Sequence, residues 1–369
     1  MRAVVYRGVN DLRLETVPVP RIGAHELLVK VAVCGVCPTD IKKIHFGTVP
    51  PPRIFGHETA GTIVKIGGGN SSLVTRHSSL KVGDRVALHH HVPCLDCHYC
   101  RHHAFAQCET YKRTGITAGF EPAGGGYAEY VRVLPFVLPG VVKIPAKNTF
   151  EEGAMLEPVN TVLKAVKRLE LLRGDTVLVA GQGPIGLMFT NILQLQGIKV
   201  LATDLLASRL KLAKKFGAHR AVLANQLSTI NHQPAFDAAI IAVPSDAAVT
   251  QALQLVRGAG KVLLFAHTKR TEVRSQKSEV RKRSSGHQPS TLNYQLDLAS
   301  ICLDEKDLIG SYSSDFTLQR EVARLVFSRR LDVRPLITHR FPLAETAAAV
   351  ALATHPTESS LKIVVNVSG

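Results

Sequence analysis

The sequence has no long apolar run and no leader-like beginning. No stretch approaches the roughly 18 consecutive apolar residues of a membrane-spanning helix. The opening residues, Met-Arg-Ala-Val-Val-Tyr-Arg-Gly, lack the hydrophobic stretch and cleavage site of a secretory signal. The composition, 45% hydrophobic and 20% charged, also excludes collagen-like, coiled-coil and wholly disordered proteins. We therefore expect a soluble, cytoplasmic protein whose 369 residues form two domains, with no membrane partner.

Acidic residues are scarce relative to basic ones. There are 29 Asp and Glu against 45 Lys and Arg, a formal charge of +16. A basic insertion at residues 268–292 holds seven Lys or Arg, two Glu and few apolar residues, which is typical of a solvated surface segment. The remaining charge forms no stripe, so we do not expect a nucleic-acid partner. A zinc-ribbon protein with a basic nucleic-acid-binding arm is the alternative from another class.

The spacing of apolar residues divides the chain into two parts. Short β-branched runs broken by Gly and Pro fill the first third and predict a mostly β domain. From about Thr161, apolar strands alternate with helical patterns, which predicts an α/β domain with a doubly wound parallel sheet. Strands are expected at 27–33, 61–66, 84–88, 127–133, 176–180, 199–203, 236–243, 261–266, 308–311 and 361–367, and helices at 162–169, 185–196, 207–216, 247–256 and 318–327.

A glycine-rich turn follows the expected strand at 176–180. Its sequence, Gly-Gln-Gly-Pro-Ile-Gly, would let a pyrophosphate approach the backbone at a helix N-terminus. The next strand ends in an aspartate, which can accept hydrogen bonds from ribose hydroxyls and would repel a 2′-phosphate. We therefore predict a dinucleotide site that favours NAD over NADP, a preference that a nearby arginine weakens. The predicted cofactor-binding residues are Gly181, Gly183, Pro184, Ile185, Gly186, Asp204 and Arg209.

Four of the seven cysteines lie within fifteen positions of a loop. Their spacing supplies four thiolates, enough for a closed tetrahedral zinc site with no place for substrate, so we predict a structural zinc. Six histidines flank the loop; extra metal binding is one interpretation, and exposed loop residues the other. The cysteines are Cys94, Cys97, Cys100 and Cys108, and the histidines are His89, His90, His91, His98, His102 and His103.

A second candidate metal site comes earlier in the chain. Cys37 follows an expected strand, and twenty residues later comes Gly56-His57-Glu58. Cys34 and Cys37 also form the C-x-x-C pattern of a redox motif, but no long amphipathic helix is expected after it, and Cys34 is more simply a core thiol. For His57 taken alone, the alternative to a metal ligand is a buried, hydrogen-bonded histidine. Together with the nucleotide motif, Cys37 and His57 suggest an open, catalytic zinc site.

These motifs occur together, and in this order, in the zinc-dependent medium-chain alcohol dehydrogenase family. The resemblance covers nearly the whole chain apart from the basic insertion. It is closest to the sorbitol/L-iditol (polyol) and threonine dehydrogenase branch, because Glu157-Pro158 stands where many alcohol dehydrogenases have a third ligand cysteine. The motifs are Cys37-Pro-Thr39-Asp40, Gly56-His57-Glu58, the four-cysteine loop, Gly83-Asp84-Arg85-Val86, Glu157-Pro158 and the glycine-rich turn.

The resemblance implies a specific domain organisation. Residues 1–152 would form a mostly β, GroES-like catalytic domain with the structural zinc loop at 89–110. Residues 153–311 would form the NAD-binding Rossmann domain, with the basic insertion inside it. Residues 312–369 would return to the catalytic domain. The family also suggests a homo-oligomer, either a dimer or a tetramer.

The resemblance further implies roles for single residues. Cys37 and His57 would be ligands of the catalytic zinc, with Glu58 or Glu157 as the third. Thr39 would pass the substrate proton outward, and Asp40 would lie beside the ligands. Many relatives have a histidine three residues after this threonine, where this chain has Lys42. An unperturbed lysine is a poor base at neutral pH, so Lys42 leaves the proton path open.

The activity expected on these grounds is hydride transfer between a small secondary alcohol or polyol and NAD, with two zinc ions per chain, as in sorbitol/L-iditol 2-dehydrogenase. A threonine dehydrogenase or another alcohol dehydrogenase is the alternative within the family. The zinc-free quinone reductases of the same superfamily, which use NADPH, fit less well because of both metal motifs and Asp204. The sequence does not specify which alcohol is oxidised.

Overall fold

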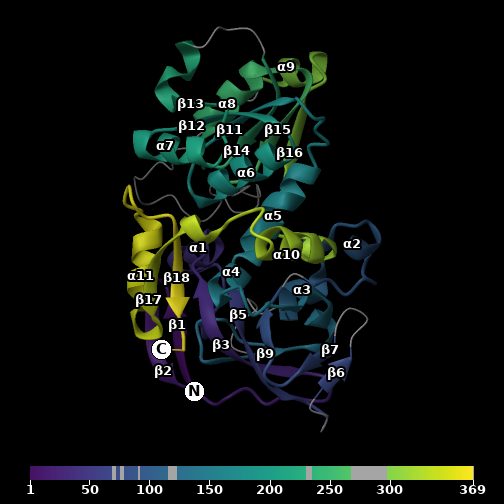
Figure 1. The fold of residues 1–369 in the computed structure, drawn as a ribbon, viewed down its shortest axis with the longest axis vertical. Coiled ribbons are helices and arrows are strands. Elements are labelled where there is room, and N and C mark those ends of the chain that lie inside the picture. Colours follow the sequence, from purple (N-terminus) through teal and green to yellow (C-terminus); the bar gives the residue numbers. More distant parts are fainter. Residues whose placement is uncertain are drawn as a thin grey trace, which may run out of the picture. The chain divides into compact units, whose positions relative to one another are not determined.

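The computed structural model describes residues 1–68, 72–74, 79–89, 92–114, 123–229, 235–266 and 297–368. The basic insertion at 268–292, together with His90 and His91, lies outside these ranges. The chain divides into two compact units (Figure 1). Unit 1 comprises Met1–Glu170, Gly183–Leu195 and Tyr312–Gly369, and unit 2 comprises Leu171–Gln182 and Gln196–Ser311. No helix among the described residues is both long and apolar enough to cross a membrane.

Unit 1 is built on a seven-stranded sheet whose main path runs β10-β8-β5-β3-β18-β17, with β9 pairing to β3. A three-stranded sheet, β2-β1-β4, and the hairpin β6-β7 accompany it. The strands are β1 (Arg2–Gly8), β2 (Asp11–Thr16), β3 (Leu27–Gly35), β4 (Arg53–Ile54), β5 (Glu58–Ile66), β6 (Ser72–Val74), β7 (Ser79–Lys81), β8 (Arg85–Ala87), β9 (Tyr130–Val133), β10 (Val142–Lys143), β17 (Ile337–Pro342) and β18 (Lys362–Asn366).

Strand β3 is the centre of this sheet because β5, β9 and β18 all pair with it in antiparallel register. Its inward residues are fully buried, as expected for a β-branched run covered on both sides. Strand β18 lies against β3 although the two are far apart in sequence, as the yellow and purple ribbons show (Figure 1). The last described strand therefore completes a sheet that begins near the amino end.

The helices of unit 1 are short, and several lie where the chain enters or leaves the sheet. Helix α4 begins with a capping box, in which Thr149 and Glu152 satisfy each other's backbone N–H groups. Helix α5 packs against both α6 and α10. The helices are α1 (Pro38–Phe46), α2 (His98–Arg101), α3 (Glu109–Thr114), α4 (Phe150–Ala154), α5 (Leu156–Lys167), α6 (Pro184–Leu195), α10 (Gln319–Phe327) and α11 (Thr346–Thr354).

Unit 2 contains a six-stranded parallel sheet in the order β13-β12-β11-β14-β15-β16. This is the doubly wound order: strands β11 to β13 are added toward one edge of the sheet and β14 to β16 toward the other, so the strand order reverses between β11 and β14. Helix α7 packs on β12 and β13, and α8 packs on β14 and β15. The elements are β11 (Thr176–Ala180), β12 (Lys199–Asp204), α7 (Ala207–Lys215), β13 (Arg220–Leu223), β14 (Phe236–Ile241), α8 (Asp246–Leu255), β15 (Val256–Leu264), α9 (Leu298–Leu303) and β16 (Asp307–Gly310).

The α/β class, the mostly β first part and the parallel Rossmann-type sheet are confirmed. Three expected elements begin at least three residues earlier than predicted. Strand β5 starts at Glu58 and not at 61. Strand β15 starts at Val256 and not at 261, with a register shift against β14 near its start. Helix α5 starts at Leu156 and not at 162, because Pro158 is tolerated in the first turn of a helix. Helices α1 and α4 lie in the part for which the sequence predicted strands alone.

A buried polar network links three segments of unit 1. Asn160 on α5 donates to Gln319 on α10 at 3.1 Å and to the backbone oxygen of Asp315 at 2.9 Å. His89, fully buried, lies 3.4 Å from the Ser314 hydroxyl. Burial lowers the pKa of His89 to about 4, against the raising effects of Asp315 and Gln319. This histidine is therefore held neutral in the folded protein.

His89 should make stability fall in mild acid. In the unfolded chain its pKa is near 6.5, so the unfolded state takes up the proton first as the pH drops. The contribution of His89 to the free energy of unfolding is complete above pH 6.5. It decreases by up to about 3 kcal/mol as the pH falls to about 4. In His89→Gln the free energy of unfolding should no longer show this decrease between pH 6.5 and about 4, as measured by urea unfolding at several pH values. Parallel pH profiles for the two proteins would show that the histidine is not buried neutral.

Candidate catalytic and metal-binding sites

Cys37 is placed by the junction between β3 and α1. It is the N-cap of α1, and Pro38 occupies the first helical position, where its missing N–H group is not needed. The backbone N–H of Thr39 donates to the Cys37 sulfur at 3.5 Å. The N-cap position holds this sulfur at the amino end of the helix. The local structure thus presents Cys37 as a metal ligand or nucleophile.

His57 and Asp40 form a buried pair next to this cysteine. The His57 Nδ1 atom lies 3.0 Å from the Asp40 carboxylate, and both side chains are almost completely buried. Burial opposes the charge on His57, but Asp40 and a hydrogen bond with Cys37 outweigh it and raise the pKa. Burial likewise opposes ionisation of Asp40, and His57 overcomes it and lowers the pKa. The carboxylate thus fixes the orientation of the imidazole through Nδ1.

Glu58 is engaged by a lysine that sequence reasoning did not single out. Lys362, in β18, forms an ion pair with Glu58 and donates to the backbone oxygen of Val36 at 3.0 Å. Both charged side chains are buried. Burial disfavours the Lys362 charge, but Glu58 and Cys37 raise its pKa. The signal in the sequence is one cation inside the apolar run Leu361-Lys-Ile-Val-Val, whose partner can be identified only when the strand pairing is known.

Glu157 completes this group from the first turn of α5. It is buried, and burial is the main reason that its pKa rises to about 7. His57 and Lys362 lower that pKa, whereas Glu58 and Asp40 raise it. Electrostatic coupling to all four groups places Glu157 in the same region of unit 1. Its carboxyl can therefore hold or release a proton near neutral pH.

The donor set suits a divalent cation. Asp40, Glu58 and Glu157 bring three buried carboxyl groups to the cation Lys362 and the imidazole of His57. Buried carboxylates are costly unless they are paired or coordinate a metal. Asp40 is paired with His57 and Glu58 with Lys362, so a bound cation would offset the remaining charge, that of ionised Glu157. Thiol, imidazole and carboxylate are also the ligand types that zinc prefers. Among the described residues, however, Cys37 and His57 do not form a compact three-ligand group with either glutamate.

The other two residues assigned to this site lie on α1. Thr39 and Lys42 are both half-buried in the first two turns of the helix. Burial lowers the pKa of Lys42, and Cys37 opposes that shift. Cys34, in contrast, is completely buried one strand position before Gly35, 3.5 Å from the Thr59 hydroxyl, and burial raises its pKa to about 12. Cys34 is thus a core thiol, as expected, and not half of a redox pair.

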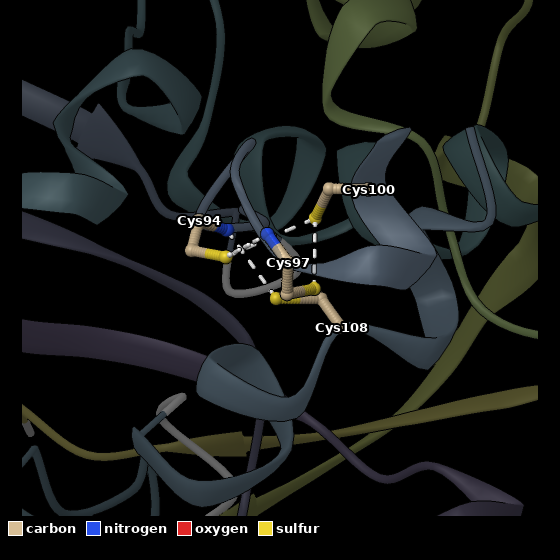
Figure 2. Close-up of side chains that lie close together, drawn as sticks. All are labelled: Cys94, Cys97, Cys100 and Cys108. Carbon is tan, nitrogen blue, oxygen red and sulfur yellow. Dashed lines mark hydrogen bonds between the residues drawn. The ribbon is translucent and has the colours of Figure 1, made fainter. Parts of the chain in front are cut away.

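The four loop cysteines converge on one point, with their sulfur atoms turned toward one another (Figure 2). All four ligand atoms lie within 4.8 Å of one another. The Cys100 sulfur is 3.9 Å from that of Cys94 and 3.5 Å from that of Cys97. Sulfurs at the corners of a tetrahedral zinc site with bonds of about 2.3 Å are about 3.8 Å apart, whereas a disulfide is about 2.05 Å long. The spacing fits a tetrahedral zinc ion.

The backbone around this cluster supports thiolates. The N–H of Cys97 donates to the Cys94 sulfur at 3.4 Å, and the N–H of Cys94 donates to the Cys108 sulfur at 3.3 Å. Backbone N–H groups of Asp96 and Cys97 lower the pKa of Cys94 to about 6, although burial raises that of Cys100 to about 12. Of the flanking histidines that the structure describes, His98, His102 and His103 are exposed and His89 is buried.

The glycine-rich turn begins in unit 2 at the end of β11. Gly181 has φ +93°, which only glycine adopts easily, and a Cβ there would lie 2.3 Å from Val243. A Cβ at Gly183 would meet nothing within 4 Å, so the space above this residue is open, as the approach of a pyrophosphate requires. The chain then enters α6 at Pro184, followed by Ile185 and Gly186. These features fit a dinucleotide.

Asp204 ends β12, in the position expected of a ribose-binding acid. Its two carboxylate oxygens accept hydrogen bonds from the backbone N–H groups of Gln182, at 2.7 Å, and Leu206, at 2.9 Å. The carboxylate is therefore oriented beside the glycine-rich turn. Arg209, the arginine expected to weaken the preference for NAD, lies on α7 and is buried.

Comparison with known proteins gives consistent matches over the whole chain. Residues 23–146 match the family "Alcohol dehydrogenase GroES-like domain", and residues 184–327 match "Zinc-binding dehydrogenase". A sorbitol dehydrogenase from Bombyx mori is 30% identical, over 99% of this chain and 98% of its own. An erythritol/L-threitol dehydrogenase from Mycolicibacterium smegmatis is 29% identical, over 97% and 96%. The solved alcohol dehydrogenase from Thermus sp. ATN1 has a TM-score of 0.79 at 26% identity and covers 99% of each chain.

Removal of one loop cysteine should cost a zinc ion and stability. We expect Cys97→Ser to lower the zinc content by one ion per chain and the melting temperature by at least about 5 °C, because the ion holds the loop together. Metal analysis and calorimetry measure both. Cys302→Ser, which changes an exposed thiol in unit 2, is the matched control and should change neither quantity. Unchanged zinc content in Cys97→Ser would rule out the cluster as a zinc site.

Proposed function

The chain belongs to the zinc-dependent medium-chain alcohol dehydrogenase family, and on that premise we propose that it transfers hydride between a small secondary alcohol or polyol and NAD, in the manner of a sorbitol/L-iditol 2-dehydrogenase. The observation that carries the proposal is the group formed by half-buried Cys37 with the buried pair His57 and Asp40, with two further carboxyl groups beside it. The sorbitol and erythritol/L-threitol dehydrogenases among its relatives support a polyol substrate.

We propose that Cys37 and His57 hold the catalytic zinc, with Glu58 or Glu157 as the third ligand. When bound, zinc supplies a Lewis acid that lowers the pKa of a substrate hydroxyl, and the nicotinamide accepts the hydride. Asp40 keeps His57 in the orientation and tautomer that a ligand needs. Lys362 balances the charge of Glu58, which leaves Glu157, with a pKa near 7, as the carboxyl that can exchange a proton. Thr39 would pass the substrate proton toward solvent.

Loss of either proposed zinc ligand should abolish turnover and leave nucleotide binding intact. We expect Cys37→Ser and His57→Ala to reduce kcat by at least about a thousandfold, because a Lewis acid lowers the activation free energy by several kcal/mol. Sorbitol, L-iditol, simple secondary alcohols and threonine would be screened with NAD and NADP, and NADH binding would be followed by fluorescence. Cys302→Ser and His355→Ala, at exposed positions, serve as controls.

Two outcomes would contradict this proposal in different ways. Full activity in both ligand variants would remove the role of zinc. If wild-type protein binds NADH but oxidises none of the alcohols, the proposed substrate class is wrong, whereas the assignment of the cofactor still holds.

Asp204 should set the preference for NAD over NADP. Asp204→Asn keeps a hydrogen-bond acceptor for the Gln182 N–H but removes the charge that repels a 2′-phosphate. We expect the ratio of kcat/KM with NADP to that with NAD to rise at least about tenfold, which corresponds to 1.4 kcal/mol. Asp175→Asn, at another aspartate of unit 2 that accepts a backbone N–H, is the matched control. An unchanged ratio would mean that Asp204 does not contact the ribose.

We also propose that the chain forms a homo-oligomer, a dimer or a tetramer, in the cytoplasm. Among the described strands β16 is an edge of the parallel sheet, and two exposed leucines of the preceding helix α9 accompany it: Leu298 and Leu303 are 69% and 81% exposed. A second copy of the chain would cover both the edge and these side chains. All seven cysteines are free, which suits a reducing compartment. Sedimentation velocity measures the oligomeric state.

A further inference from the structure

Two exposed histidines, His98 at the start of α2 and His102 at its C-cap, lie one helical turn apart beside the cysteine cluster. The N–H of His102 donates to the backbone oxygen of His98 at 3.3 Å, which closes the turn. Their ring centroids are 4.6 Å apart, and the ring planes are inclined by 56°. Residues four apart on a helix share a face, so both rings project from the same side of α2. Neither the proposed zinc sites nor the nucleotide site uses this pair.

The ring separation equals that of two imidazoles bound to one ion. A ligating ring nitrogen is about 2.1 Å from the metal, which places the ring centre about 3.2 Å from it. Two rings that meet at one ion with an angle of about 90° to 109° therefore have centres about 4.5–5.2 Å apart. The observed separation of 4.6 Å lies in this range.

We propose that His98 and His102 form a bidentate surface site for one divalent cation that prefers imidazole, such as Ni²⁺, Zn²⁺ or Cu²⁺. Water would occupy the remaining coordination positions. Imidazole favours these ions over Mg²⁺ and Ca²⁺, which prefer oxygen ligands. The site is separate from the four thiolates.

The cysteine cluster holds the turn that carries both histidines. Cys97 is the N-cap of α2, and Cys100 lies within it, with the two sulfurs 3.5 Å apart. At 100° per residue, the histidine pair faces about 150° away from the cysteine pair. The same short helix can therefore bind one ion on its inner face and another on its outer face. Because the inner ion orders the turn, it lowers the entropy cost of binding at the outer face.

The one cationic side chain of this helix is paired with a carboxylate. Arg101, on the same turn, is directed back to Asp96, donating to its backbone oxygen at 2.9 Å and its carboxylate at 3.1 Å. His103 follows the turn in a left-handed conformation, φ +55°, and its ring packs edge-on against Phe105 at 5.7 Å. His103 is thus an exposed imidazole next to the pair that is not part of it, which makes it a matched control.

The test is a Ni²⁺ titration by calorimetry of zinc-loaded, tag-free protein, since Ni²⁺ does not oxidise thiols. The variants are His98→Gln, His102→Gln, the double variant and His103→Gln. Each single substitution in the pair should weaken the tightest Ni²⁺ site at least tenfold. The double variant should be within twofold of either single variant, because loss of one ligand already destroys the chelate. His103→Gln should bind within twofold of wild type.

Other results would overturn the proposal. Single variants that bind Ni²⁺ like wild type would show that the two rings are only stacked. Losses that add up in the double variant would mean two independent imidazoles, and an equal loss in His103→Gln would mean nonspecific binding by the histidine-rich loop. Zinc content and melting temperature, measured on every variant, should match wild type, because the substituted side chains are exposed.

Discussion

The proposed catalytic centre depends on strand pairing at one residue, Gly35. This last residue of β3 lies opposite Glu58 of β5 on one side and opposite Val364 of β18 on the other. A Cβ at Gly35 would be 1.8 Å from the Glu58 carboxylate, so only glycine leaves room for that side chain. The pairing brings the segment containing Cys37, the start of β5 and Lys362 to one place. Distant parts of the sequence thus meet through backbone register and not through any local motif.

Burial then decides how these side chains behave. Asp40, Glu58 and Glu157 all lie out of contact with solvent, and each is affected differently by its neighbours. His57 lowers the pKa of Asp40, Lys362 pairs with Glu58, and burial raises the pKa of Glu157 to about 7. Three chemically similar carboxyl groups are therefore suited to different tasks: to orient a ligand, to hold charge and to exchange a proton. The surrounding charges, rather than the residue type, make the difference.

Regular elements were largely predictable, since their apolar periodicity is local. The strand expected at 199–203 is β12, Lys199–Asp204, and the helix expected at 207–216 is α7, Ala207–Lys215. The start of β15 was not predicted, because Arg257-Gly-Ala-Gly shows no strand alternation. Cys37 and His57 could be singled out from spacing and the family resemblance. Lys362 could not, since it lies 304 positions from Glu58 and no sequence pattern specifies which strands pair.

Strand β18 has a consequence for the order in which the chain can become native during synthesis. Lys362 and Val36, which are hydrogen-bonded, are 326 positions apart, so the sheet containing β3 stays incomplete until almost all of the described chain has left the ribosome. Pairing of such distant segments pays a large loop-closure entropy and is slow. Until then the edge of β3 is uncovered and Glu58 lacks its counterion. The sheet that contains the first-translated strands is therefore completed late. In the interval, chaperones would protect its open edge from aggregation.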